Sequence, residues 1–221
     1  MQKIFILVIQ FFISFPIVAQ TNDWPEELNT AKDALYLTEI QKNVILELNK
    51  VRSNPKRFAE EYMDDLQTSF NGKLFTYPGQ DPVRTAEGIA PLIECLKILK
   101  VTSPLPILTP AEGLAKASAD LVADQLKHGG IGHITRDGTT PQKRIEKYGI
   151  WDICSAEDIT YGSYEARQIV IFLLIDDGVP DRAHRKNILN PCFHFAGVSY
   201  GNHPTYESMC VIDYAGEYKT K

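Results

Sequence analysis

Two apolar segments close to the end of the chain restrict its fold more than any other feature of the sequence. Residues 195–200 and 209–215 each have the length and composition of a β-strand, and the turn-rich segment GNHPTYES lies between them. Such a pattern predicts an antiparallel hairpin. Alternate residues of a third predicted strand, 151–160, share one face: Ile153, Ser155, Glu157 and Ile159. We therefore expect a central sheet that is mainly antiparallel.

Predicted helices surround these strands. Apolar residues recur at helical spacing in four segments: residues 38–51, 55–66, 86–100 and 109–127. Residues 166–175 are mostly apolar all round and could form a buried strand, but their length and the preceding Gly162-Ser163 favour a buried helix. A shorter helix is expected to begin at Thr140-Pro141 and to stop at Gly149. Helices before, between and around the strands predict an α+β fold, a three-layer α-β-α sandwich with a mainly antiparallel central sheet.

Three finer expectations concern the helix ends and the connections. Thr109 is expected to cap the helix of residues 109–127, with Glu112 completing a capping box. Ile89 is expected on the buried face of the helix of residues 86–100. Residues 67–85 are rich in Gly, Pro, Asn and Asp and predict a long loop, which is a candidate lid.

The first twenty residues are typical of a secretory signal peptide rather than of the folded domain. Lys3 precedes an apolar run from Ile4 to Ile13, and Ala19 supplies a small residue for cleavage. The run is shorter than the ~20 apolar residues that span a membrane. We therefore expect a signal peptide (1–20), a loosely packed N-terminal extension (21–37) and a single domain (38–221). The mature chain is expected to be secreted, extracellular and without a membrane span.

Charge and cysteine content indicate which classes of binding partner and cross-link the sequence favours. The formal net charge is −5, which gives no electrostatic basis for binding nucleic acid. An even number of cysteines in a secreted chain favours disulfides, and four allow three pairings: Cys95, Cys154, Cys192 and Cys210. The sequence leaves the pairing open, and buried free thiols are the alternative. No CxxC motif is present, so these cysteines do not predict a zinc knuckle.

Two histidines and a glutamate from three separate segments are the candidate site. His133 lies in GHITRDGTTP, Glu157 in SAEDITYG and His184 in DDGVPDRAHRKNIL. Imidazoles bind zinc and similar metals, and a carboxylate orients an imidazole or holds a water. The metalloprotease motif HExxH is absent. A cluster that only satisfies buried polar groups and holds the loops is an equally simple interpretation.

Together these phrases resemble the CAP superfamily, also called SCP/TAPS, over about residues 40–216. The superfamily includes cysteine-rich secretory proteins, insect antigen 5 and plant pathogenesis-related proteins, and the DDGVPDRAHRKNIL phrase resembles its bacterial or protist branch. The phrases that carry the resemblance follow one another in the family's order: LNKVRSNPKRFA, LAKASADLVAD, GHITRDGTTPQKRI, SAEDITYG, HRKNIL, FAGVSYG and CVIDYAG.

The resemblance implies a cleft lined by two histidines and two acidic residues. His133, Glu157 and His184 match three of these positions, and Asp176 or Asp177 takes the fourth, where the family usually has a glutamate. A divalent metal such as zinc is then expected on His133 and His184. No catalytic residue is assigned, and a binding role is expected rather than an enzymatic one.

Three functions are compatible with such a cleft. The first is a secreted binding module for a small apolar ligand, such as a sterol or fatty acid, or for a divalent metal. The second is a metal-dependent, peptidase-like hydrolase. The third is a structural or partner-interaction protein whose cleft only stabilises the fold. Fold alone does not decide between them.

Overall fold

The computed structural model describes residues 23–221, so the expected signal peptide lies outside the described residues. The helices are α1 (Glu39–Ser53), α2 (Pro55–Tyr62), α3 (Ala90–Leu99), α4 (Glu112–His128), α5 (Pro141–Tyr148), α6 (Ala166–Ile175) and α7 (Ala183–Ile188). The strands are β1 (Phe70–Asn71), β2 (Leu74–Phe75), β3 (Val83–Arg84), β4 (Thr109–Pro110), β5 (Gly149–Tyr161), β6 (Phe195–His203) and β7 (Glu207–Thr220). Two short 3₁₀ turns span Glu26–Leu28 and Asp64–Ser69.

The central sheet has the strand order β4-β6-β7-β5. β6 and β7 form the expected antiparallel hairpin, and β5 pairs antiparallel with β7. The two-residue β4 adds a parallel pair on the other side of β6. β5 is therefore an edge strand, and its outer side is available for a cleft.

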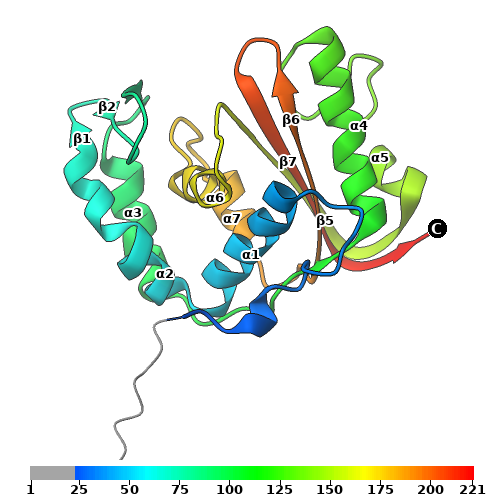
Figure 1. Ribbon diagram of the computed structural model, residues 1–221, viewed down its shortest axis with the longest axis horizontal. Coiled ribbons are helices and arrows are strands. Elements are labelled where there is room, and N and C mark those ends of the chain that lie inside the picture. Colours follow the sequence, from blue (N-terminus) through cyan, green and yellow to red (C-terminus); the bar gives the residue numbers. More distant parts are fainter. Residues whose placement is uncertain (1–22) are drawn as a thin grey trace, which may run out of the picture.

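Helices cover both faces of this sheet, and the molecule has the predicted three layers (Figure 1). α1, α6 and α7 lie on one side of the sheet, with α2 and α3 beyond them, and α4 and α5 lie on the other. Gly197 explains the close approach of α4, because a Cβ there would lie 2.1 Å from the backbone nitrogen of Ala115. The α+β, α-β-α prediction is confirmed.

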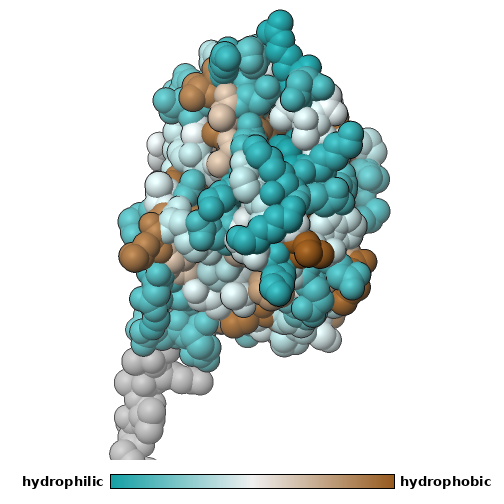
Figure 2. Space-filling model, turned by 90° about the vertical axis from the view of Figure 1, so that its right-hand side faces the viewer, coloured by the Kyte–Doolittle hydropathy of each residue, from teal (hydrophilic) through white to brown (hydrophobic). Residues whose placement is uncertain are grey.

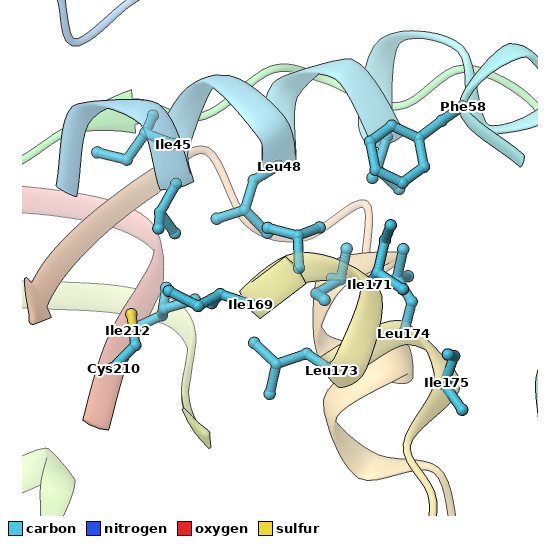
Figure 3. Packing of buried hydrophobic residues seen from close by; sticks show 14 of the residues in the cluster. Ile45, Leu48, Phe58, Ile169, Ile171, Leu173, Leu174, Ile175, Cys210 and Ile212 are labelled. Carbon is cyan, nitrogen blue, oxygen red and sulfur yellow. The ribbon is translucent and has the colours of Figure 1, made fainter. Parts of the chain in front are cut away.

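The main core lies between α1, α6 and the sheet (Figure 3). Ile45 and Leu48 of α1 face Ile169 and Leu173 of α6, and Ile212 of β7 closes the cluster. Each such side chain stabilises the fold by roughly 1.5–3 kcal/mol when it leaves water. α6 is mostly apolar all round and is packed on several sides, so the predicted buried helix is confirmed.

The surface of the molecule on the side of α4 and α5, across the sheet from the main core, is mainly hydrophilic (Figure 2). α4 buries one side against β6 and β7 through Leu114, Ala117 and Leu121. Gly129 ends α4 with φ 68°, a backbone conformation that favours glycine. α5 begins at Pro141 with Thr140 as its cap and ends at Tyr148, as predicted.

The segment expected as a long loop folds as a second, smaller sheet of three two-residue strands, β1, β2 and β3. The rings of Phe70 and Phe75 stack at 4.5 Å across β1 and β2. Phe75 and Tyr77 then contact Phe172 of α6, with ring centroids 5.9 and 5.7 Å away. Aromatic packing thus holds this segment against α6.

The same segment is also fastened by hydrogen bonds. The carboxylate of Asp177 accepts the backbone N–H groups of Ala86 and Glu87 at 2.7 and 2.8 Å. Glu87 accepts the backbone N–H of Gly178 and pairs with Arg182. The small sheet is therefore tied at its end to the turn that follows α6.

Some local predictions were wrong. Thr109 does not cap α4, because Thr109 and Pro110 pair with β6 and leave Ala111 at the N-cap. Ile89 precedes α3 and is 36% exposed. Ile153 is 69% exposed with φ 73°, because the pairing register shifts between Asp152 and Ser155 and breaks the alternation.

The predicted loose packing of residues 21–37 was also wrong where the structure describes them. Leu28, Ala31 and Leu37 are buried. The amide of Asn49 donates to the carbonyl oxygens of Leu28 and Leu108 at 2.9 and 3.1 Å. This stretch is an integral part of the domain.

Two of the four cysteines form a disulfide, and the other two remain free thiols. Cys154 and Cys192 form a disulfide that links β5 to the loop before β6. Cys95 and Cys210 are buried free thiols, and burial raises the pKa of Cys95 to about 12. In the described part of the chain, no helix has the length and apolar character needed to cross a membrane.

Candidate functional site

His133 and Glu157 form the first of two histidine–carboxylate pairs. His133 follows α4 in a glycine-rich loop, and Glu157 lies in the middle of β5. The Nδ1 atom of His133 donates to Oε1 of Glu157 at 2.8 Å. The His133 side chain is 45% exposed, whereas that of Glu157 is buried. The carboxylate therefore fixes the orientation of an imidazole that still faces solvent.

Arg144 of α5 is the second partner of Glu157. Its guanidinium contacts Oε2 of Glu157 and donates to the carbonyl oxygen of His133 at 2.9 Å. Arg144 is itself buried. A buried charge is stable only when it is paired and hydrogen-bonded, so Arg144 and Glu157 depend on each other. Together they connect β5, α5 and the His133 loop.

A second acid, Asp213 of β7, lies beside Glu157. The two residues are direct partners in the pairing of β5 and β7. Asp213 accepts a hydrogen bond from the hydroxyl of Ser118 at 2.8 Å. Complete burial, and then the charge of Glu157, raise the pKa of Asp213 well above its usual range. Asp213 therefore holds its proton more tightly than an exposed aspartate does.

His184 and Asp176 form the second pair, at the junction of α6 and α7. Asp176 ends α6 in a left-handed conformation, φ 60°, which aspartate tolerates better than most residues. Its carboxylate accepts Nδ1–H of His184 at 2.6 Å and the backbone N–H groups of His184 and Arg185 at 3.0 and 3.2 Å. One carboxylate thus orients the imidazole and caps α7.

Three acidic residues raise the pKa of His184. Burial acts in the opposite direction and lowers it. The hydrogen bond that His184 donates to Asp176 and the charges of Asp158, Asp176 and Asp181 outweigh burial. Asp158 is completely buried, and this burial raises its pKa to about 7. Asn187 of α7 donates to it at 2.7 Å.

Asp176 rather than Asp177 contacts the second histidine. The Asp177 carboxylate is occupied by the backbone of the small sheet. The two expected histidines and the two expected acids are therefore arranged as separate pairs, His133–Glu157 and His184–Asp176.

The pairs do not provide a metal site of three or more protein ligands. Among residues 23–221, no group of three or more His, Cys, Asp or Glu side chains is placed to hold a metal ion. Each imidazole uses Nδ1 for its carboxylate and has only Nε2 left for a ligand. Two Nε2 atoms are fewer protein ligands than the three or four of ordinary zinc sites, and we derive no metal-dependent chemistry from them. Zinc on His133 and His184 stays a prediction.

A cavity of about 350 Å³ opens beside His184. Its wall consists mainly of apolar and aromatic side chains contributed by the small sheet, α6 and the end of β5: Phe70, Phe75, Val83, Ile159, Tyr161, Phe172, Leu173 and Tyr206. Asp176, Asp177 and His184 line it as well, and Arg84 and Thr85 come from β3 and the residue after it. This volume falls within the range of ligand pockets, ~300–1,000 Å³.

Several residues of the site were missed or misjudged from sequence. Asp158 and Asp213 interrupt apolar strands, and that interruption was the signal for buried acids. Arg144 stands among exposed lysines of α5 and carried no such signal. Arg185 follows His184 and was not among the candidate site residues. Its guanidinium is buried and bonds Glu94 and three backbone carbonyl groups.

Comparisons with known proteins give one family match and two similar solved structures. The model of the cysteine-rich secretory protein family, CAP, matches residues 101–214. An outer surface protein from Borrelia burgdorferi is 21% identical, with a TM-score of 0.43, over 53% of this chain and 80% of that chain. An extracellular protein containing a SCP domain from Bacillus anthracis is 18% identical, with a TM-score of 0.41, over 50% of this chain and 34% of that one. No curated protein matches the sequence.

Proposed function

The chain belongs to the cysteine-rich secretory protein (CAP) family, and we propose that it is a secreted binding module for a small apolar ligand. The cavity between the small sheet, α6 and β5 carries this proposal. Its wall is mainly apolar, and it also carries a few polar groups: Arg84, Thr85, Thr160, Asp176, Asp177 and His184. Pockets for small molecules combine an apolar lining with a few placed polar groups in this way.

The small sheet forms one wall of the cavity and is held in place by the rest of the domain. Aromatic contacts to Phe172 and hydrogen bonds to Asp177 hold β1, β2 and β3 at its rim. A wall that is already in place reduces the ordering cost of binding. The segment expected as a lid is thus proposed to be one fixed side of the ligand site.

Secretion is part of the same proposal. The N-terminal twenty residues have the order of a signal peptide. The Cys154–Cys192 disulfide supports an oxidising compartment, because such bonds are rare in the cytosol. Detection of the protein in culture supernatant, with an N-terminus near residue 21 by mass spectrometry, tests this part.

Binding itself is tested by displacement of a fluorescent fatty acyl or sterol probe from the purified protein. Val83 lines the cavity and is 48% exposed, so Val83→Asp places a charge on the apolar wall with little effect on folding. Binding is expected to weaken at least ~tenfold, since an unpaired charge against an apolar ligand costs more than ~1.4 kcal/mol.

Val101→Asp is the matched control. Val101 is 83% exposed and is not part of the cavity wall. This variant is expected to bind the probe like the unaltered protein. Absence of binding in the unaltered protein, or an equal loss in both variants, would contradict the proposal.

A further inference from the structure

The charged groups around the cavity are not equally available to a ligand. Asp176 accepts three hydrogen bonds from His184 and Arg185, and Asp177 accepts two from the backbone of Ala86 and Glu87. Asp176 therefore uses most of its acceptor capacity within the protein, and Asp177 uses about half. His184 is engaged through Nδ1 with Asp176. These three groups form an internally compensated end of the cavity.

Arg84 is different. It lies in β3, where its backbone pairs with Leu74, and it lines the cavity from an exposed position. Its guanidinium makes no hydrogen bond or ion pair with any residue in the described part of the chain. Neighbouring Val83 and Phe75, which pair with each other, belong to the apolar wall. A free cation thus stands beside an apolar cavity.

We propose that Arg84 binds the acidic head group of an amphiphilic ligand, so that the site prefers a long-chain carboxylate to a neutral sterol or alcohol. This inference rests on the proposed function. A guanidinium donates two parallel N–H groups to a carboxylate, which gives both strength and direction. The hydrocarbon chain lies among Phe70, Phe75 and Phe172, and the head group stays at the solvent-exposed guanidinium.

The experiment compares two ligands with the same alkyl chain, lauric acid and lauryl alcohol, at a pH at which the acid is ionised. Each displaces the same neutral fluorescent probe from the full mature chain. The unaltered protein is expected to bind the acid about tenfold more tightly than the alcohol, the factor that corresponds to ~1.4 kcal/mol. In Arg84→Gln this preference disappears, while the affinity for the alcohol stays the same.

Two further variants make the result specific. Arg84→Lys keeps the charge but loses the paired donors, so part of the preference returns. Lys143→Gln removes a positive charge from exposed α5, away from the cavity, and leaves the preference intact. Raising the salt concentration weakens binding of the acid and not of the alcohol, since the guanidinium is exposed.

The outcomes distinguish failure of the role of Arg84 from failure of the proposed apolar binding site. Equal affinity for acid and alcohol in the unaltered protein would overturn the role of Arg84 while leaving an apolar binding site. The same follows if Arg84→Gln keeps the full preference for the acid. Binding of neither ligand overturns the proposed function and, with it, this inference.

Discussion

Glu157 and Asp158 are consecutive residues of β5 whose side chains serve opposite faces of the sheet. Glu157 contacts His133 and Arg144 on the side of α4 and α5. Asp158 accepts a hydrogen bond from Asn187 of α7 on the other side. One edge strand thus places two buried acids in two different polar clusters. Substitutions in these clusters should therefore change the stability of the domain.

Glu157→Gln is expected to destabilise the domain by ~3–5 kcal/mol, because it leaves the buried guanidinium of Arg144 without a counter-charge. Urea unfolding followed by circular dichroism measures the loss. Glu146→Gln, on the exposed side of α5, is the matched control and should change the free energy of unfolding little. A loss below ~1 kcal/mol for Glu157→Gln would show that the pair is not structurally important.

Asp158→Asn is expected to stabilise the protein above neutral pH. The pKa of Asp158 is raised from its usual 3.8 to about 7, so the folded state holds its proton more tightly than the unfolded state. That contribution to stability is complete below pH 3.8 and is lost as the pH rises to 7 and beyond. The gain at pH 8 should be on the order of 2–4 kcal/mol, with little change at acidic pH.

Unfolding curves at several pH values measure this difference. Asp33→Asn, at an exposed position of the same residue type, should leave the pH dependence as it is. Identical pH profiles for Asp158→Asn and the unaltered protein would show that folding does not raise the pKa of Asp158.

Asp176→Asn is expected to lower the pKa of His184. Asparagine keeps the left-handed backbone and an oxygen that accepts from α7, but it removes the charge that favours the imidazolium. In the unaltered protein the raised pKa of His184 contributes stability below pH 6.5 that is lost as the pH rises through the folded value. NMR titration of the His184 ring protons checks the shift, and an unchanged midpoint would contradict the assigned pairing.

Asp177→Ala is expected to loosen the small sheet without unfolding the domain. It removes the acceptor for the N–H groups of Ala86 and Glu87, and each such hydrogen bond contributes roughly 0.5–1.5 kcal/mol. Hydrogen–deuterium exchange should then increase in residues 70–88 and stay low in α1 and α6. Asp181→Ala, in the same turn, serves as the control, and equal exchange in the two variants would refute the anchoring role.

Removal of the disulfide by the paired substitutions Cys154→Ser and Cys192→Ser is expected to cost about 3–4 kcal/mol, because the bond closes a loop with a sequence separation of 38. Denaturant unfolding measures the loss. Thiol titration of the unfolded, unreduced protein should find two free thiols, those of Cys95 and Cys210. Four free thiols would contradict the assigned pairing.

The layered fold could be predicted from sequence because it depends on periodicity. The hairpin of β6 and β7, the bounds of α5 and the buried α6 all follow from local patterns of apolar and turn residues. The ends of elements were less predictable. The capping pattern at Thr109 was overruled by pairing with β6, which is a long-range contact and leaves no local signal.

The candidate residues could be selected from the sequence, but their contacts could not be predicted from it. The phrases around His133, Glu157 and His184 marked them, yet only the structure shows that each histidine has its own carboxylate. The choice of Asp176 over Asp177 depends on the left-handed turn at the end of α6. The cavity depends on residues 70–85 folding against Phe172, and aromatic contacts across such a distance in sequence cannot be read from local patterns.

The central claim is that an apolar chain occupies the cavity between the small sheet, α6 and β5. Photo-crosslinking with a lauric acid analogue that carries a diazirine at the end of its chain, followed by peptide mass spectrometry, tests it most directly. Adducts are expected within residues 70–85 and 159–179; excess lauric acid should abolish them, and Val83→Asp should reduce them. Adducts confined to other parts of the domain, or labelling that lauric acid does not displace, would contradict it.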